Sequence, residues 1–260
     1  MRFLKQLTLT AAALATAAAL SSAQADGMKL KIGTEGAYPP FNNLTADGKL
    51  EGFDIDIAKA LCAEMKAECT FVTQDWDGII PALQAGKYDA IIASMSITDE
   101  RKKKVDFTEK YYNTPPAIAV PKDSALKGTS PADLADAAIG VQGSTTHSNY
   151  TEATYTDSTV RGYPTADEYK LDIASGRLDA VVDDVTVLQE WLESEDGDCC
   201  KLLGTIVPDP AIHGEGAGIA IRKGETELAQ KFNAAIEAIR ANGVYKSIND
   251  KYFTFDAYGG

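Results

Sequence analysis

The sequence predicts an α/β protein built from two similar lobes. Its 260 residues are 45% apolar and 24% charged, the composition of a soluble globular protein with room for one large or two modest domains. From Lys29 onward, short apolar runs alternate with helical patterns, which is typical of a mostly parallel sheet covered by helices. A stretch of twelve residues also recurs later in the chain. These three observations predict the fold class.

Three strands and two helices are expected in the first part of the chain. The strands are predicted from short apolar runs at Lys29–Gly33, Cys69–Thr73 and Ala90–Ala93. Apolar residues four positions apart predict a helix over Gly52–Met65, and a second helix is expected around Ile79–Ala85. Strand and helix therefore alternate from the start.

Further helix starts follow from capping residues. Thr98 precedes two acidic residues and can cap a short helix. Capping-box patterns at Ser130–Asp133 and Thr165–Glu168 predict two more helix starts. An apolar stripe over Leu228–Ile239 predicts a long helix that stops around Gly243.

The repeat aligns Leu83–Ser94 with Ile173–Asp184 without gaps, 90 residues apart. Each copy runs from a helix end through Gly, a basic residue and Asp-Ala into a buried strand. A weaker Gly-x-x-Gly pair begins at Gly33 and Gly140. Two ordinary helix–strand junctions could also coincide by chance. We interpret the repeat as two α/β lobes whose strands deliver polar groups to a shared cleft, because ligands of open α/β sheets bind at the carboxyl ends of strands.

The N-terminus has the pattern of a secretory signal peptide. Arg2 and Lys5 precede the uncharged run Leu7–Leu20, and small residues lead to a cleavage site after Ala25. An anchoring helix is the alternative, but the run is shorter than the ~20 residues that a bilayer span needs. We therefore expect export to the periplasm with removal of residues 1–25.

Export would place the four cysteines in an oxidising compartment, where disulfides can form. Cys62 and Cys69 flank a short helix-to-strand turn, and an oxidising compartment permits a disulfide between them. Two free buried thiols are the alternative. Cys199 and Cys200 stay unassigned, since four cysteines allow three connectivities.

Charge and histidine content exclude two classes of protein. The net charge is −13, and it becomes −15 once residues 1–25, with two basic and no acidic residues, are removed. A nucleic-acid partner is not expected, because a phosphate backbone needs a basic face. The two histidines, His147 and His213, lie 66 residues apart and outside any metal motif. We expect no metal and no cofactor.

Four segments fall at predicted strand ends and supply the chemistry of the expected cleft. They are Glu35–Tyr38, Ser94–Arg101, Gln142–Thr146 and Asp183–Asp184.

Three of these groups suit the charges of an amino acid. Arg101 offers a planar donor fork for a carboxylate, although it also begins a basic run that could simply be solvated. Gly143–Thr145 follows a strand and opens a helix, so its N–H groups can form an anion site. The alternative is that Ser144 is a plain serine cap of the helix. Asp184 can hold an ammonium group or can cap the helix Val185–Glu193.

A cationic side chain suits the remaining groups. Glu35 provides a carboxylate, and Tyr38 and Trp76 provide aromatic faces for cation–π stacking. Taken singly, each aromatic residue is better explained as part of the core. Together they favour a ligand with a positively charged tail.

Motifs along the whole mature chain resemble a known family, the polar amino-acid periplasmic binding proteins of ABC importers. Within it, the chain resembles the lysine/arginine/ornithine and histidine branch, with octopine- and nopaline-type binders as near relatives. The motifs are Tyr38-Pro39-Pro40-Phe41, Gly52-Phe53-Asp54-Ile55-Asp56, Trp76-Asp77-Gly78-Ile79-Ile80-Pro81, Ser94-Met95-Ser96-Ile97-Thr98-Asp99-Glu100-Arg101 and Gly143-Ser144-Thr145.

The resemblance implies a two-lobed periplasmic binding protein fold of type II, with two hinge strands and a cleft between the lobes. Lobe 1 would comprise residues 26–113 and 214–260, and lobe 2 residues 118–209. The hinges would lie near 113–117 and 208–214, where Pro and Gly interrupt the pattern.

The resemblance also implies roles for individual residues. Arg101 would bind the α-carboxylate with the backbone of Ser96 and Thr145, while Asp184 and Ser94 would bind the α-amino group. The residues around the ligand side chain would be Glu35, Tyr38, Trp76, Ala93, Val141 and Ser144. Lysine/arginine/ornithine binders carry Asp, Phe and Ser where this chain has Glu35, Trp76 and Ala93. These changes resemble arginine/ornithine or opine binders, so arginine is favoured over lysine.

The expected function is therefore capture of a cationic L-amino acid, with lysine and histidine as further candidates, and delivery to an ABC permease in the inner membrane. A monomer is expected. One alternative is an enzyme resembling cyclohexadienyl dehydratases, with Glu35 and Asp184 as an acid/base pair. Others are an opine-binding protein and a receptor ectodomain, and the latter needs a membrane span.

Overall fold

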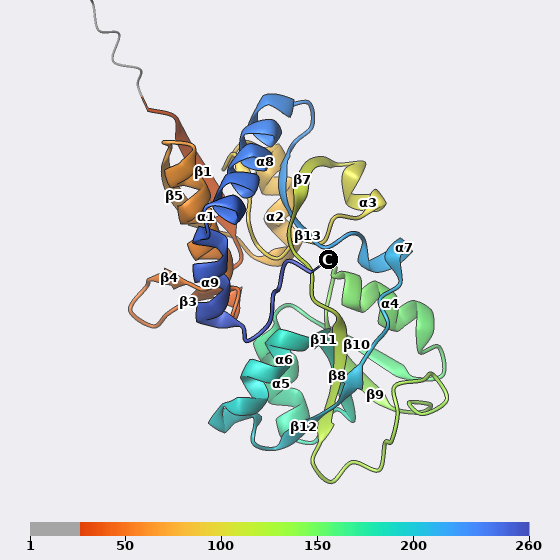
Figure 1. The fold of residues 1–260 in the computed structure, drawn as a ribbon. Helices are drawn as coiled ribbons and strands as arrows, with labels where there is room; N and C mark the ends of the chain where they lie inside the picture. The colour runs from red at the N-terminus through yellow and green to blue at the C-terminus, as the bar shows by residue number, and fades with distance from the viewer. Residues whose placement is uncertain (1–26, 260) are drawn as a thin grey trace, which may run out of the picture.

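Two α/β lobes joined at a narrow waist make up the computed structural model, which describes residues 27–259 (Figure 1). The expected signal peptide lies outside the described residues. Each lobe is built on a five-stranded sheet. The two-lobed α/β architecture predicted from the sequence is confirmed. No helix among residues 27–259 is long and apolar enough to cross a membrane.

Lobe 1 contains the sheet with strand order β5-β1-β6-β13-β7. Strands β5, β1 and β6 are parallel, and β13 runs antiparallel to both of its neighbours. The strands are β1 (Lys29–Thr34), β5 (Glu68–Thr73), β6 (Ala90–Ile91), β7 (Val105–Tyr112) and β13 (Ala217–Arg222). The helices are α1 (Phe53–Glu64), α2 (Trp76–Gln84), α3 (Asp99–Lys102), α8 (Thr226–Ala241) and α9 (Val244–Tyr252). A small antiparallel sheet consists of β2 (Ala37–Tyr38), β3 (Asn42–Leu44) and β4 (Leu50–Glu51).

Lobe 2 contains the sheet with strand order β10-β9-β11-β8-β12. Here β10, β9 and β11 are parallel, and β8 is antiparallel to β11 and β12. The strands are β8 (Pro116–Pro121), β9 (Ala138–Gln142), β10 (Thr159–Tyr163), β11 (Ala180–Asp184) and β12 (Cys200–Thr205). The helices are α4 (Thr146–Thr154), α5 (Ala166–Ala174), α6 (Val185–Glu193) and the short 3-10 helix η1 (Glu195–Gly197).

The internal repeat is a structural repeat. In lobe 1 Asp89 donates its N–H to the Lys31 carbonyl, and its carboxylate accepts the N–H of Lys31, both at 2.8 Å. In lobe 2 Asp179 makes the same two bonds with Ala138, again at 2.8 Å. The strands that follow pair in the same register, β1 with β6 and β9 with β11. Equivalent residues of the repeat therefore lie at equivalent positions in the two lobes.

The Gly-x-x-Gly pair belongs to the same repeat. A Cβ atom at Gly33 would overlap the ring of Tyr88, and one at Gly140 would overlap the side chain of Leu178. Tyr88 and Leu178 occupy equivalent positions of the repeat. The glycines thus let the strand before each cleft segment pack closely on the neighbouring helix–strand junction.

The chain passes between the lobes twice. The first passage is the short segment 113–115 between β7 and β8, and the second is the segment 206–216, which contains α7 (Pro210–His213). The Asn113 N–H donates to the carbonyl of Ala257 at 2.8 Å, so the C-terminal segment lies against the first passage. In Figure 1 the segment that follows α9 accordingly runs to the waist.

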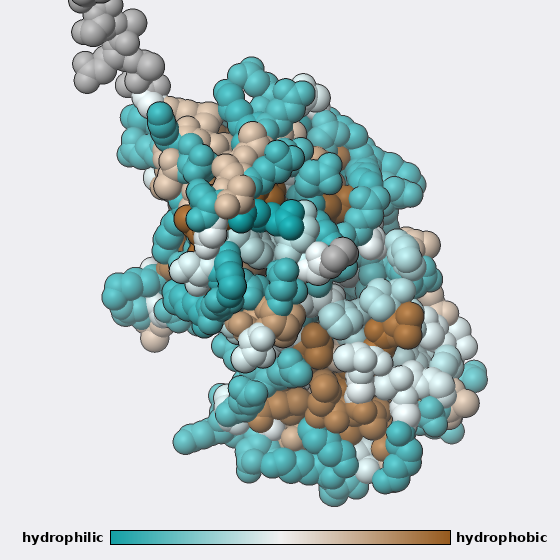
Figure 2. Space-filling view, in the orientation of Figure 1, coloured by the Kyte–Doolittle hydropathy of each residue, from teal (hydrophilic) through white to brown (hydrophobic). Residues whose placement is uncertain are grey.

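Each lobe has a core of its own, although Val187 of α6 in lobe 2 packs into the core of lobe 1. Ile32 and Ile219 belong to the core under α1 and α8, whereas Ile118 and Ile139 belong to a core of lobe 2. Figure 2 shows two masses with a constriction between them, mostly hydrophilic, with hydrophobic residues exposed on lobe 2 over β8 and β12. Because each lobe has its own core, the lobes can move as units.

Two local expectations differ from the structure. Ser130 and Asp133 form the expected reciprocal cap, with the Ser130 N–H donating to the Asp133 carboxylate at 3.1 Å, but only turns follow. Asp136 has a φ of 65°, which ends the turn before β9 begins. At the other end of the chain, Gly243 stops α8 as predicted, and the further helix α9 follows it.

The structure pairs Cys62 with Cys69, as predicted, and also joins Cys199 to Cys200. The first bridge ties the end of α1 to the edge strand β5. Cys62 and Cys200 are equally buried, at 4% and 3% exposure, so the pairs differ mainly in the chain segment they close.

Removal of the first bridge is expected to destabilise the protein. Replacing Cys62 and Cys69 together with alanine should lower the free energy of unfolding by ~2 kcal/mol, because the bridge restricts the unfolded chain. Thermal denaturation measures this loss, and the Cys199→Ala/Cys200→Ala variant is the control, since adjacent residues close almost no loop. Equal losses in the two variants would contradict the expectation.

Candidate ligand-binding cleft

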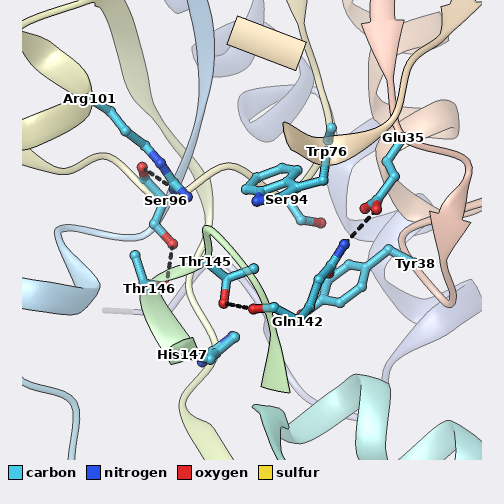
Figure 3. Close-up of a pocket in the computed structure, with 11 residues that line it drawn as sticks. Glu35, Tyr38, Trp76, Ser94, Ser96, Arg101, Gln142, Thr145, Thr146 and His147 are labelled. Carbon is cyan, nitrogen blue, oxygen red and sulfur yellow. Dashed lines mark hydrogen bonds between the residues drawn. The ribbon is translucent and has the colours of Figure 1, made fainter. Parts of the chain in front are cut away.

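A cavity lies between the lobes where β1, β6 and β9 end (Figure 3). Residues of both lobes line it. They are Glu35, Tyr38, Trp76, Ala93, Ser94, Ser96, Arg101, Gln142, Thr145, Thr146 and His147. The carboxyl ends of strands from two sheets meet here, as the sequence analysis expected of the cleft.

Most of the residues selected from the sequence lie in this cavity. Eight of the eleven predicted site residues line it: Glu35, Tyr38, Trp76, Ala93, Ser94, Ser96, Arg101 and Thr145. Ser144 lines a neighbouring cavity, and its carbonyl oxygen accepts the indole N–H of Trp76 at 3.0 Å. Asp184 lines an adjoining cavity that shares Tyr38 and Ser94 with the first. Val141 contacts neither cavity.

Val141 differs from its expected place because successive side chains of a strand alternate between the two faces. Its side chain is fully buried in the lobe 2 core with Ile118 and Ile139. The next residue, Gln142, points into the cleft instead. The expectation that Val141 surrounds the ligand side chain is therefore corrected to Gln142.

Arg101 is held by two backbone carbonyls, one from each lobe. Its Nη1 donates to the Ser96 carbonyl at 3.0 Å, and Nη2 lies 3.4 Å from the Ser144 carbonyl. The guanidinium carbon lies 5.2 Å from the centre of the Trp76 ring. Thr98 caps α3 through the Arg101 N–H, as predicted, and so fixes the backbone that carries the side chain.

The charge of Arg101 is free for a ligand. Burial lowers its pKa to about 10, so the group stays cationic at neutral pH. Among residues 27–259, no carboxylate lies within ion-pair distance of it. A half-buried cation bonded only to carbonyl oxygens is suited to a carboxylate from outside the protein.

The start of α4 faces the same end of the cleft. Strand β9 ends at Gln142, Ser144 has a φ of 58°, and Thr145 caps the helix by accepting the Ser148 N–H at 3.0 Å. The cap is therefore Thr145, not Ser144. The first N–H groups of a helix have no partner within it, so this nine-residue helix presents donors to an anion.

Glu35 faces Gln142 across the cleft. The Gln142 Nε2 donates to Glu35 Oε1 at 2.6 Å and to the Pro164 carbonyl at 3.1 Å. The two side chains occupy equivalent positions of the Gly-x-x-Gly repeat and point at each other in Figure 3. Burial raises the pKa of Glu35 to about 7, against the opposing effect of the Gln142 hydrogen bond.

The buried Asp54 carboxylate holds the Ser94 side chain in place by a hydrogen bond. The Ser94 hydroxyl donates to Asp54 Oδ2 at 2.9 Å, and Asn42 and Tyr111 donate to the same carboxylate at 2.8 and 2.7 Å. Burial raises the pKa of Asp54 to about 6. Ser94 adopts a φ of 54°, and this network holds it there with its oxygen toward the cleft.

Asp184 caps α6, one of the two alternatives that the sequence left open. Its Oδ1 accepts the Thr186 N–H at 2.8 Å and the Thr186 hydroxyl at 2.6 Å, and Oδ2 accepts the Thr114 hydroxyl. Burial raises its pKa. The carboxylate borders the adjoining cavity together with Ser94, so a cap and a ligand role are compatible here.

Four polar residues of the cleft received no role of their own from the sequence, although three of them belong to the segments expected to supply its chemistry. Gln142, Thr146 and His147 line it, and Asp183 accepts the Tyr38 hydroxyl from the opposite lobe. All four belong to segments at predicted strand ends or directly after them, and strand alternation was the signal for Gln142.

The site combines a cation, two carboxylates and aromatic faces. Arg101 and the start of α4 suit a carboxylate, Asp184 and Ser94 suit an ammonium group, and Glu35 suits a positive tail. Within the described chain, no group of three or more His, Cys, Asp or Glu side chains is placed to hold a metal ion. The arrangement is complementary to a zwitterion with a cationic side chain.

Known structures share this fold over most of the chain. An ancestral arginine-binding protein bound to arginine is 39% identical with a TM-score of 0.80, over 86% of this chain and 98% of that one. An ancestral amino acid-binding protein that is a precursor of cyclohexadienyl dehydratase is 36% identical with a TM-score of 0.78, over 87% and 95%.

Sequence comparisons agree with the structural ones. An L-arginine-binding protein of Pseudomonas aeruginosa is 48% identical over 259 residues, 98% of this chain and 99% of its own. The model of the bacterial extracellular solute-binding proteins, family 3, matches residues 30–255. With nearly the whole described chain matched, the protein belongs to family 3 of the bacterial extracellular solute-binding proteins.

Proposed function

We propose that this protein is the periplasmic substrate-binding component of an ABC importer for a cationic L-amino acid, arginine first and ornithine second. One observation carries the proposal: among the described residues, an unpaired arginine, Arg101, and a half-buried carboxylate, Glu35, line one cavity between two lobes. The relative named for L-arginine supports arginine as the first ligand to test.

Each ligand group has a partner in this proposal. Arg101 and the N–H groups at Thr145 and Ser96 bind the α-carboxylate, and Asp184 with Ser94 binds the α-ammonium. Glu35 pairs with the guanidinium, which lies between Tyr38 and Trp76. Gln142 keeps Glu35 oriented. Charge-assisted hydrogen bonds are roughly twice as strong as neutral ones, so this set accounts for selection of a zwitterion with a positive tail.

Closure of the lobes completes the site. Lobe 1 comprises residues 26–113 and 214–260, lobe 2 comprises 118–209, and the hinges lie near 113–117 and 208–214. The ligand binds lobe 1 through Arg101 and Glu35, and closure brings Thr145 and Asp184 from lobe 2. The permease then recognises the closed form, whose population rises because the ligand binds it more tightly.

An enzyme of the cyclohexadienyl dehydratase type is the competing function, since one structural neighbour is a precursor of that enzyme. It would need Glu35 and Asp184 as an acid/base pair. Asp184 already accepts three hydrogen bonds, two from Thr186 as the α6 cap and one from Thr114, which argues against a proton-transfer role. Turnover of prephenate or arogenate by the purified protein would favour the enzyme.

A thermal-shift screen against the amino acids and opines tests the proposal. Arginine at 100 times its dissociation constant should add ~2.7 kcal/mol to the free energy of unfolding. The shifts with histidine, lysine and octopine measure the selectivity for the ligand side chain, and glutamate is the control of opposite charge. If none of the cationic compounds raised the melting temperature, the proposal would be overturned.

The N-terminal sequence of the exported protein tests cleavage after Ala25.

Arginine affinity is expected to fall at low pH through Glu35. Burial raises the pKa of Glu35 to about 7, while the bound guanidinium requires the ionised carboxylate. With that pKa, arginine should bind about tenfold more weakly at pH 6 than at pH 8. The stability of the ligand-free protein has the opposite dependence: the contribution of Glu35 is complete below its ordinary pKa and is lost as the pH rises through about 7.

Calorimetry across pH 6–8 measures this dependence, and the Glu35→Gln variant should give a flat profile. A flat profile for the unaltered protein would show that Glu35 does not take up a proton before the ligand binds.

A further inference from the structure

Tyr38 and Asp183 form a partly buried contact between the lobes. The Tyr38 hydroxyl, on β2 of lobe 1, donates to Asp183 Oδ1 at the end of β11 in lobe 2. The residues are 145 positions apart in the chain. We call this hydrogen bond the closing contact.

Lobe 2 holds the Asp183 carboxylate in place. It is 1% exposed, accepts the Tyr169 hydroxyl of α5 at Oδ2, and accepts the N–H of Asp184 at Oδ1 with a distance of 2.7 Å. Among the residues that the structure describes, the nearest basic group is His147, whose Nε2 lies 3.6 Å from Oδ1. The carboxylate is therefore a fixed, negatively charged acceptor that belongs to one lobe.

Only the Tyr38 bond, of these three hydrogen bonds, joins the two lobes. Opening the cleft moves β2 away from β11, so the Tyr38 hydroxyl and one carboxylate oxygen are returned to water. Tyr169 and Asp184 stay with Asp183 because all three lie in lobe 2. Closure thus gains a charge-assisted hydrogen bond whether or not a ligand is present.

We propose that Asp183 is a positioning residue that acts through Tyr38: the closing contact sets how readily the cleft closes, and thereby the apparent affinity for every ligand alike. Apparent affinity scales with the fraction of protein in the binding-competent form, so a contact outside the ligand changes all affinities by one factor. The inference rests on the proposed function, because it concerns the same cleft.

The Tyr38→Phe variant tests this, since it removes the hydroxyl and keeps the ring. We expect the arginine affinity to fall about tenfold, the loss of one charge-assisted hydrogen bond. Ornithine and lysine should lose the same factor. Stopped-flow measurement should place the loss in faster dissociation, because the contact breaks when the cleft opens.

Tyr169→Phe is the matched control, because it removes a phenol hydroxyl from the same carboxylate within one lobe. It should lower the melting temperature and leave arginine affinity within about twofold of the unaltered protein, as expected for a change that spares the lobe-to-lobe contact. Equal losses of affinity in Tyr38→Phe and Tyr169→Phe would overturn the proposal.

A double-mutant cycle separates the closing contact from a direct contact of Tyr38 with the ligand. In the Asp183→Asn background, Tyr38→Phe should cost much less than tenfold, because its partner has lost its charge. An unchanged tenfold cost there would assign the hydroxyl to the ligand and overturn the proposal. If Asp183→Asn does not fold, two measurements on Tyr38→Phe replace the cycle. An unchanged ratio of arginine to ornithine affinities together with faster dissociation supports the closing contact, and a changed ratio overturns it.

If the unaltered protein binds no amino acid, the proposed function fails, whereas normal binding by Tyr38→Phe overturns only the closing contact.

Discussion

Replacing Arg101 with alanine is expected to weaken arginine binding by roughly a hundredfold or more while leaving the protein folded. Within residues 27–259 the guanidinium bonds only to the carbonyls of Ser96 and Ser144, so its loss leaves none of their carboxylates without a partner. The ligand, by contrast, would bury its α-carboxylate without a counter-charge. Truncating one member of a desolvated charge pair costs several kcal/mol, which is the origin of this magnitude.

Calorimetry of Arg101→Ala with arginine and with agmatine measures the effect. Agmatine lacks the α-carboxylate, so its weaker affinity should be the same for the variant and the unaltered protein. Arg177→Ala is the control: its guanidinium pairs with Asp172 outside the cleft, and its loss should leave binding unchanged. If Arg101→Ala retained the affinity of the unaltered protein, Arg101 would not bind the carboxylate.

The fold could be predicted from the sequence to a large extent, because its two lobes repeat one unit. The Asp89–Lys31 and Asp179–Ala138 bonds have the same geometry because the segments around them are alike in sequence. Helix α9 was not predicted from the sequence, because Gly243 ends α8 and no pattern before the glycine indicates that another helix follows. The capping box at Ser130 shows the converse: local hydrogen bonds form, but no apolar stripe follows to sustain a helix.

The candidate site could be predicted only within each lobe. Residues at the end of one strand are neighbours by sequence, and Glu35 and Tyr38 were found in this way. Which residue of one lobe meets which of the other depends on how the two passages orient the lobes, and no local pattern encodes that. The pairs Glu35–Gln142 and Tyr38–Asp183 therefore required the structure.

Replacing Asp184 with asparagine is expected to weaken arginine binding by roughly thirtyfold or more, the second largest effect. Asparagine keeps an Oδ1 that can accept the Thr186 N–H, so the cap of α6 is retained while the negative charge is removed. The α-ammonium of the ligand then loses its counter-charge inside a closed cleft, where a hydrogen-bonded charge pair contributes several kcal/mol.

The matched ligand is δ-guanidinovaleric acid, which is arginine without its α-amino group. Calorimetry should show that Asp184→Asn leaves the affinity for this compound nearly unchanged, because the group that Asp184 binds is missing. The control variant is Asp179→Asn, which removes the same charge just before the other end of β11. A loss of equal size for arginine and for δ-guanidinovaleric acid would show that Asp184 acts only as a helix cap near the first passage. The ammonium would then have to be bound by Ser94 and the cleft carbonyls, and selection of an amino acid would rest on Arg101 alone.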